Sequence, residues 1–72
     1  MNTETIGLNA GAVWNALNAA DAMGVKQLKK VTKLKDKELY AALGWLARED
    51  KVNINVDPKD EKELVVSLTQ DK

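Results

Sequence analysis

The sequence contains no cysteine and no histidine among its 72 residues. Without cysteine no disulfide can cross-link the fold, and a zinc site would need carboxylates alone, which zinc rarely uses. The most common general base and the thiol nucleophile of enzymes are also missing. The single serine, Ser67, has no base beside it, and the four glycines match no phosphate-binding loop. We therefore expect no catalytic residues, no metal and no cofactor.

Long apolar runs are also missing. No stretch approaches the roughly 20 apolar residues of a membrane helix. The first five residues, Met-Asn-Thr-Glu-Thr, lack the basic and apolar regions of a signal peptide. The lack of cysteine suits a reducing compartment. These features predict a cytoplasmic protein, and the length predicts a single domain over residues 1–72.

The net charge is zero because eleven basic residues balance eleven acidic ones. A neutral chain does not attract nucleic acid over its whole surface. It is also prone to self-association, because no net charge repels one copy from another. The charges are, however, unevenly distributed. A lysine-rich segment opposed by one acid, Asp36, contains Lys26, Lys29, Lys30, Lys33, Lys35 and Lys37.

Apolar residues recur with helical spacing in three segments, which predicts three helices. The first helix covers about 5–22, the second about 26–32 and the third about 36–49. Gly24 would adopt the left-handed conformation past the first helix, and Asp50 would do so past the third. The inward-facing residues are expected to be Ile6, Ala10, Val13, Leu17 and Ala20, then Val25, Leu28, Val31 and Thr32, then Leu39, Ala42, Leu43 and Leu46.

The period then changes to the alternation of β-strands. Two strands at about 51–56 and 63–69 enclose a polar turn at 57–62 that holds the one proline, so we expect a β-hairpin. An isolated hairpin is only marginally stable, so its apolar face should pack on the helices. Residues around Gly24 and Val25 are candidates for a third strand. Three helices followed by a hairpin predict an α+β fold of the winged helix-turn-helix type.

Two stretches carry a family resemblance. The run from Ala41 to Val52 (AALGWLAREDKV) and the run from Ala10 to Leu17 (AGAVWNAL) resemble an uncharacterised family of small prokaryotic winged helix-turn-helix domains. The resemblance covers nearly the whole chain and implies the fold, but it implies no particular activity. The chain has Asp50 where winged helices usually have glycine.

The first functional hypothesis is binding of nucleic acid. In a helix-turn-helix the second helix and the turn follow the DNA backbone while the third helix enters the major groove. If about four of the lysines met phosphates, affinity would fall with salt at a log–log slope near −3.6. The candidate contacts, in a DNA-binding protein of low sequence specificity involved in transcription regulation, are Lys26, Lys29, Lys30, Lys33, Lys35, Lys37, Tyr40, Arg48, Lys59 and Lys62. The alternative for the lysines is an ordinary solvated helix face.

The second hypothesis is a protein-interaction module, in the first instance a homodimer. The outward face of the third helix offers no forked donor at its centre to read a base. Small residues beside aromatic ones favour a protein partner instead. The candidate interface comprises Tyr40, Ala41, Gly44, Trp45 and Arg48, or else Trp14 with the glycine edge of the first helix.

Both tryptophans and both glycines of the first helix have a simpler interpretation. A tryptophan is usually well buried, so we expect Trp14 and Trp45 to contribute to the core. The spacing of Gly7 and Gly11 would make room for a helix that crosses within the same domain.

Overall fold

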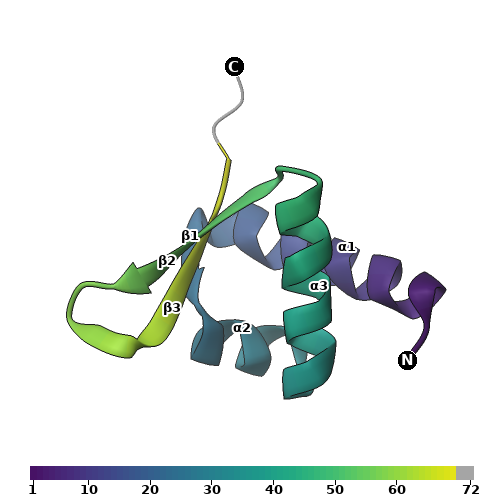
Figure 1. Ribbon diagram of the computed structural model, residues 1–72, viewed down its shortest axis with the longest axis horizontal. Helices are drawn as coiled ribbons and strands as arrows, with labels where there is room; N and C mark the ends of the chain where they lie inside the picture. The colour runs from purple at the N-terminus through teal and green to yellow at the C-terminus, as the bar shows by residue number, and fades with distance from the viewer. Residues whose placement is uncertain (70–72) are drawn as a thin grey trace.

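The computed structural model describes residues 1–69 and has the predicted winged helix-turn-helix architecture (Figure 1). Helix α1 (Thr3–Ala20) leads into the short strand β1 (Ala22–Gly24), followed by α2 (Val25–Thr32) and α3 (Asp36–Arg48). Strands β2 (Val52–Asp57) and β3 (Asp60–Leu68) form the C-terminal hairpin, or wing. None of the helices in this part of the chain has an apolar stretch long enough to cross a membrane.

The three strands form an antiparallel sheet in which β3 lies between β1 and β2. Val66 of β3 is paired with Met23 on one side and with Ile54 on the other. A third strand at this point agrees with the sequence-based expectation. The polar turn is shorter than predicted, because β3 begins at Asp60 and the carboxylate of Asp57 accepts the Lys59 N–H at 2.8 Å to close the turn.

Helix α1 begins and ends earlier than the apolar periodicity indicated. It begins at Thr3 because Asn2 caps it: the Asn2 side chain accepts the Thr5 N–H at 2.9 Å, and the Thr5 hydroxyl accepts the Asn2 N–H at 2.8 Å. It ends at Ala20 because Asp21 takes a positive φ of 70°. The expectation for Gly24 was wrong, since its φ is −71°. Asp50 has a φ of 60°, as predicted.

The core lies where the three helices meet one face of the sheet. Each helix contributes to it, and the sheet adds one residue from β2 and one from β3. The helices are held together mainly by apolar contacts, since no buried side chain among the described residues is charged. The buried residues are Ala10, Val13, Leu17, Val25, Leu28, Leu39, Ala42, Leu43, Leu46, Val52 and Val66.

Four apolar residues do not face inward as expected, two from the helices and two from the apolar face predicted for the hairpin. Ala20 is exposed at the end of α1, and Val31 is 49% exposed because Thr32 turns inward instead and donates its hydroxyl to the Leu28 carbonyl. Ile54 and Val56 are also exposed, because the hairpin projects away from the helices (Figure 1). The apolar face of the wing is therefore only partly covered.

Candidate nucleic-acid interface

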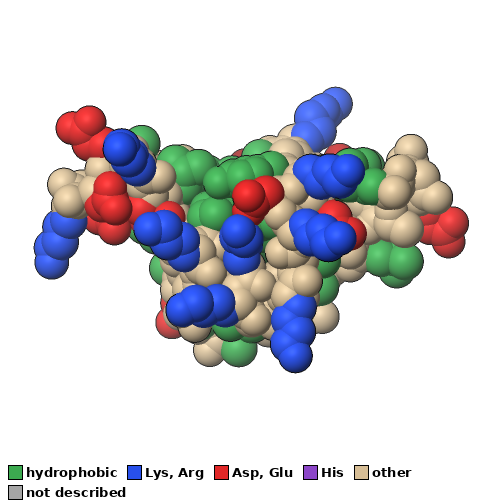
Figure 2. All heavy atoms as spheres, turned by 90° about the horizontal axis from the view of Figure 1, so that it is seen from below, with side chains coloured by type: hydrophobic (Ala, Val, Ile, Leu, Met, Phe, Trp, Pro, Cys, Tyr) green, Lys and Arg blue, Asp and Glu red, His purple; other side chains and the backbone are tan. Residues whose placement is uncertain are grey.

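Helix α2 is short and strongly two-sided. Val25 and Leu28 are buried, whereas Lys26, Lys30 and Lys33 are exposed. We refer to these three lysines together with Lys29, Lys35 and Lys37 as the lysine face. Figure 2, which views the molecule from the side of α2 and the beginning of α3, shows Lys and Arg side chains spread across this surface.

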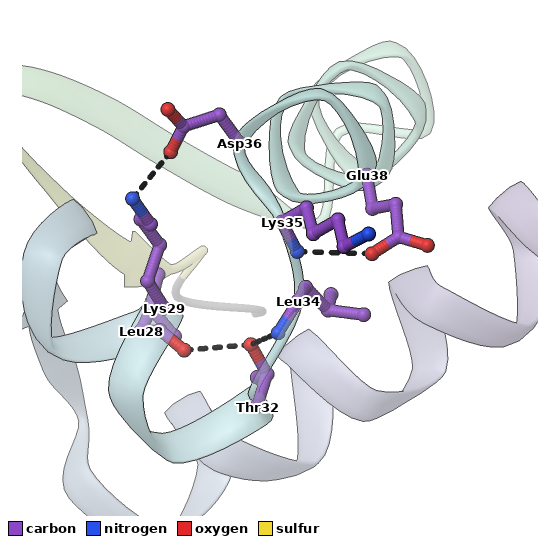
Figure 3. Close-up of polar contacts among 7 residues, drawn as sticks. All are labelled: Leu28, Lys29, Thr32, Leu34, Lys35, Asp36 and Glu38. Atoms are coloured by element: carbon purple, nitrogen blue, oxygen red, sulfur yellow. Dashed lines mark hydrogen bonds and ion pairs between the residues drawn. The ribbon is translucent and has the colours of Figure 1, made fainter.

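The turn between α2 and α3 is fixed by local hydrogen bonds (Figure 3). The Thr32 hydroxyl donates to the Leu28 carbonyl at 2.6 Å and accepts the Leu34 N–H at 3.4 Å. Lys33 takes the left-handed conformation and ends α2. At the start of α3, a carboxylate oxygen of Glu38 accepts the Lys35 N–H at 2.9 Å. These contacts hold the backbone of the turn, which carries Lys33 and Lys35, in one arrangement.

One lysine of this face already has an anionic partner. The Lys29 ammonium lies 2.6 Å from a carboxylate oxygen of Asp36 (Figure 3). The hydrogen bond and the charge of Asp36 raise the pKa of Lys29 above its ordinary 10.5, so it remains protonated at neutral pH. Both side chains are substantially solvent-exposed, so the pair adds little stability. Its main effect is to neutralise one positive charge of the lysine face.

This ion pair does not follow from the helical periodicity, because Lys29 and Asp36 belong to different helices. Within residues 1–69 it is the only ion pair. The other five lysines of the face have no carboxylate within salt-bridge distance in this part of the chain. Residues 26–37 therefore carry six lysines against one aspartate, a net charge of +5.

The wing has the opposite charge balance. Lys59 and Lys62 are both exposed near its tip, but residues 57–63 also contain two more acids than bases. Two of these acids cap the lysine backbones: Asp57 accepts the Lys59 N–H, and Asp60 accepts the Lys62 N–H at 3.1 Å. Red and blue side chains accordingly alternate at the wing tip in Figure 2. The positive charge of the wing lysines is therefore offset by nearby acids, unlike that of most α2 lysines.

The outward face of α3 contains few hydrogen-bond donors. Tyr40 is 49% exposed, Gly44 and Arg48 are exposed, and Ala41 is partly buried. Ala41 and Gly44 have no side-chain donor or acceptor, and Arg48 is the last residue of the helix. The middle of α3 could therefore fit against a DNA groove by shape, but it cannot read bases through forked hydrogen bonds.

Trp45 points to a different side of α3 from Tyr40. It lines an open groove of about 310 Å³ between α1 and α3, with Trp14 on the opposite helix. Trp14 is 37% exposed and Trp45 is 43% exposed, so the expectation that both belong to the core was wrong. We refer to this surface as the tryptophan groove; its lining is Gly7, Ala10, Gly11, Trp14, Asn15, Trp45, Leu46 and Lys51.

The glycines of α1 do not make room for a helix of the same domain. A Cβ atom placed on Gly7, Gly11 or Gly44 would meet no atom within 4 Å. Each of these helical glycines costs about 1 kcal/mol relative to alanine. The groove is therefore open at Gly7 and Gly11, and nothing within residues 1–69 requires glycine there for steric reasons.

The family profile described as "Winged helix-turn-helix domain (DUF2582)" matches residues 1–68. The chain belongs to this family. An uncharacterised protein of Methanocaldococcus jannaschii, MJ1608, is 38% identical over 69 residues, which cover 88% of this chain and 89% of the archaeal protein. The resemblance to an uncharacterised family of small winged helix-turn-helix domains is thus confirmed.

Solved structures of the same fold include regulators that are larger. The solution structure of BT2368 from Bacteroides thetaiotaomicron is 35% identical, with a TM-score of 0.79, and the match covers 94% of this chain and 79% of that one. The transcriptional regulator PcaV of Streptomyces coelicolor has a TM-score of 0.81 at 23% identity. A mutant MarR from E. coli, complexed with operator DNA, has a TM-score of 0.75 at 22% identity.

The match to PcaV covers 85% of this chain and 45% of the regulator, and the match to MarR covers 96% and 47%. The chain thus spans less than half the length of these two regulators. At these identities the likeness establishes the shared fold, a winged helix of the kind found in MarR-type regulators.

Proposed function

We propose that this winged helix-turn-helix domain binds duplex DNA through the lysine face, with low sequence specificity, as a module of transcription regulation in the cytoplasm. The observation that carries the proposal is the concentration of unpaired positive charge on α2 and the turn. Lys26, Lys30 and Lys33 are exposed, and none has an acidic partner within residues 1–69. In a helix-turn-helix these are the elements that follow the DNA backbone.

The composition of α3 supports the low specificity. Phosphate contacts position a protein on the duplex, whereas base contacts specify the sequence. The centre of the outward face consists of Ala41 and Gly44, which offer the bases no hydrogen bond. Lys37, Tyr40 and Arg48 are the residues of α3 that would approach the groove, and Lys59 and Lys62 of the acidic wing would contribute less.

The regulators of the same fold lend support by analogy. PcaV is a transcriptional regulator, and the MarR structure contains operator DNA. A shared fold does not determine function, so the proposal depends on the charges of this chain rather than on theirs.

The test is a titration of the domain into a fluorescently labelled duplex, followed by anisotropy at two salt concentrations. The expected result is micromolar binding that weakens steeply with salt and differs little between unrelated sequences. Lys30→Gln should weaken binding severalfold. The matched control Lys51→Gln removes the same charge from the tryptophan groove and should leave binding nearly unchanged. Absence of binding at low salt would refute the proposal.

The second hypothesis, a protein interface along the outward face of α3, is weakened by the direction of Trp45. Its ring lines the groove with Trp14 instead of extending the strip formed by Tyr40, Ala41 and Gly44. The strip therefore has only one exposed aromatic residue, Tyr40. The features typical of a protein interface are gathered at the tryptophan groove instead.

A further inference from the structure

Strand β2 forms an open edge of the sheet. In the strand order β1-β3-β2 it pairs with β3 on one side only, and beyond its first residue it extends away from the helices (Figure 1). Residues 53–56 are all exposed. Edge strands are usually protected by a charge, a proline or a bulge, whereas residues 52–56 contain no charge and no proline, and the register shift of the hairpin falls after Val56. This edge is therefore suited to accept another strand.

The free hydrogen-bonding groups of this edge belong to every second residue of β2. The Thr69 N–H donates to the Lys51 carbonyl at 3.1 Å, so Lys51 and Thr69 are a hydrogen-bonded pair of the antiparallel ladder. Hydrogen-bonded and non-hydrogen-bonded pairs alternate along such a ladder. The N–H and C=O groups of Val52, Ile54 and Val56 therefore point away from β3. Within residues 1–69 no hydrogen bond from outside the sheet reaches these groups.

We propose that β2 pairs with β2 of a second copy of this chain, antiparallel and about a two-fold axis at Ile54. The strand is self-complementary in this register, because residues 52–56 read Val-Asn-Ile-Asn-Val in both directions. Ile54 lies opposite itself, and Val52 lies opposite Val56 of the second copy. The outward N–H and C=O groups of these three residues then face groups of the opposite kind, as an antiparallel ladder requires. A two-fold axis is the symmetry that relates two identical surface patches.

The side chains on both faces of β2 also match across this axis. Successive side chains of a strand point to opposite faces, so Ile54 and Val56 lie on the same face as the buried Val52. Ile54 is 37% exposed and Val56 is 55% exposed. Pairing gives both an apolar neighbour, since Ile54 lies beside its counterpart and Val56 lies beside Val52 of the second copy. On the other face Asn53 lies opposite Asn55 of the second copy, and amide side chains both donate and accept hydrogen bonds.

The charges at the two ends of the segment fit the same direction of pairing. Lys51 precedes the segment and Asp57 follows it, so antiparallel pairing brings Lys51 of each copy to the end that holds Asp57 of the other. A parallel pairing in register would instead bring like charges together. Glu49 and Asp50 also lie near Lys51, so the charges favour the antiparallel direction and add little affinity.

The association should stop at two copies and should be weak. The opposite edge of the sheet is β1, which has only three residues and leads directly into α2. Two joined β2 strands therefore leave no second long edge for further copies. A contact between two single strands covers less than the roughly 1,200 Å² of a standard interface, so we expect a dissociation constant of about 10–100 µM.

The test combines sedimentation of the whole chain between about 5 and 500 µM with amide hydrogen exchange measured by nuclear magnetic resonance at both concentrations. The expected result is a monomer at low concentration, a dimer at high concentration and slower exchange of the Ile54 and Val56 amides in the dimer. The Asn53 and Asn55 amides are the internal control, because they point toward β3 and should exchange alike in both states. A chain that remains monomeric, or a dimer in which the Ile54 and Val56 amides exchange as in the monomer, would overturn the proposal.

Two variants and one control locate the contact. Ile54→Lys places two like charges against each other at the axis. Ile54→Pro removes the outward N–H but leaves the ladder to β3 intact, since proline is tolerated on an edge strand where the N–H points to solvent. Each variant should weaken dimerisation at least tenfold. Val31→Lys makes the matched change at an exposed β-branched residue of α2 and should leave the dimer unchanged.

Circular dichroism checks that each variant is folded. Dimers that persist in both folded Ile54 variants would refute pairing through β2, whatever the result of the DNA titration.

Discussion

The salt dependence of DNA binding follows directly from the ion pair at the lysine face. Six lysines lie in residues 26–37, but Lys29 is held by Asp36, so five remain to contact phosphates. Each phosphate contact contributes about −0.9 to the slope of log affinity against log salt concentration, so the wild type should have a slope of about −4.5. A fourfold rise in salt, from about 50 to 200 mM, should then weaken binding about 500-fold.

The perturbation is the triple substitution of Lys26, Lys30 and Lys33 by glutamine. Two lysine contacts remain, so the slope should fall to about −1.8 and the same rise in salt should weaken binding only about 12-fold. Glutamine keeps the helix propensity nearly unchanged, so the fold should be retained. Anisotropy titrations of both proteins over this salt range measure the two slopes, and circular dichroism checks the helix content. Equal slopes in two folded proteins would refute the assignment of these lysines to phosphates.

Three further predictions concern the ion pair, the glycines and the core. Asp36→Asn releases Lys29, so DNA affinity should rise and the slope of log affinity against log salt concentration should steepen by about 0.9. Glu49→Gln makes the same charge change at the far end of α3 and is the control. Weaker DNA binding by Asp36→Asn would contradict the release of Lys29. Gly7→Ala adds a methyl group in open space and should raise the free energy of unfolding by about 1 kcal/mol in urea denaturation, whereas a loss of stability would mean that the groove is closed in solution. Leu17→Ala creates a cavity at a fully buried position and should lower that free energy by about 3 kcal/mol, and a loss below about 1 kcal/mol would show that α1 is not packed as described.

The order and type of the main elements followed from the apolar periodicity. The stripe through Ala10, Val13 and Leu17 is buried as expected, and so is the stripe through Leu39, Leu43 and Leu46. These patterns are local and depend only on the period of one element. The helix ends were less accurate, because Asn2 and Asp21 determine them through capping and backbone conformation rather than through hydrophobicity.

The surface features depended on contacts between elements, which periodicity does not describe. Lys29 meets Asp36 only because the turn folds α3 back beside α2. Trp14 and Trp45 line one groove only because α1 packs against α3. A signal for the groove was nevertheless present, since the sequence from residue 5 to residue 20 contains no charged side chain.

Nuclear magnetic resonance of the isotopically labelled domain, titrated with a short DNA duplex, distinguishes binding at the lysine face from binding at the tryptophan groove. If duplex DNA is held by the lysine face, the amide signals of α2, the turn and the beginning of α3 should shift with added DNA. The indole signals of Trp14 and Trp45 should stay in place. Shifts centred on the two indoles, or no shift at low salt, would contradict binding at the lysine face.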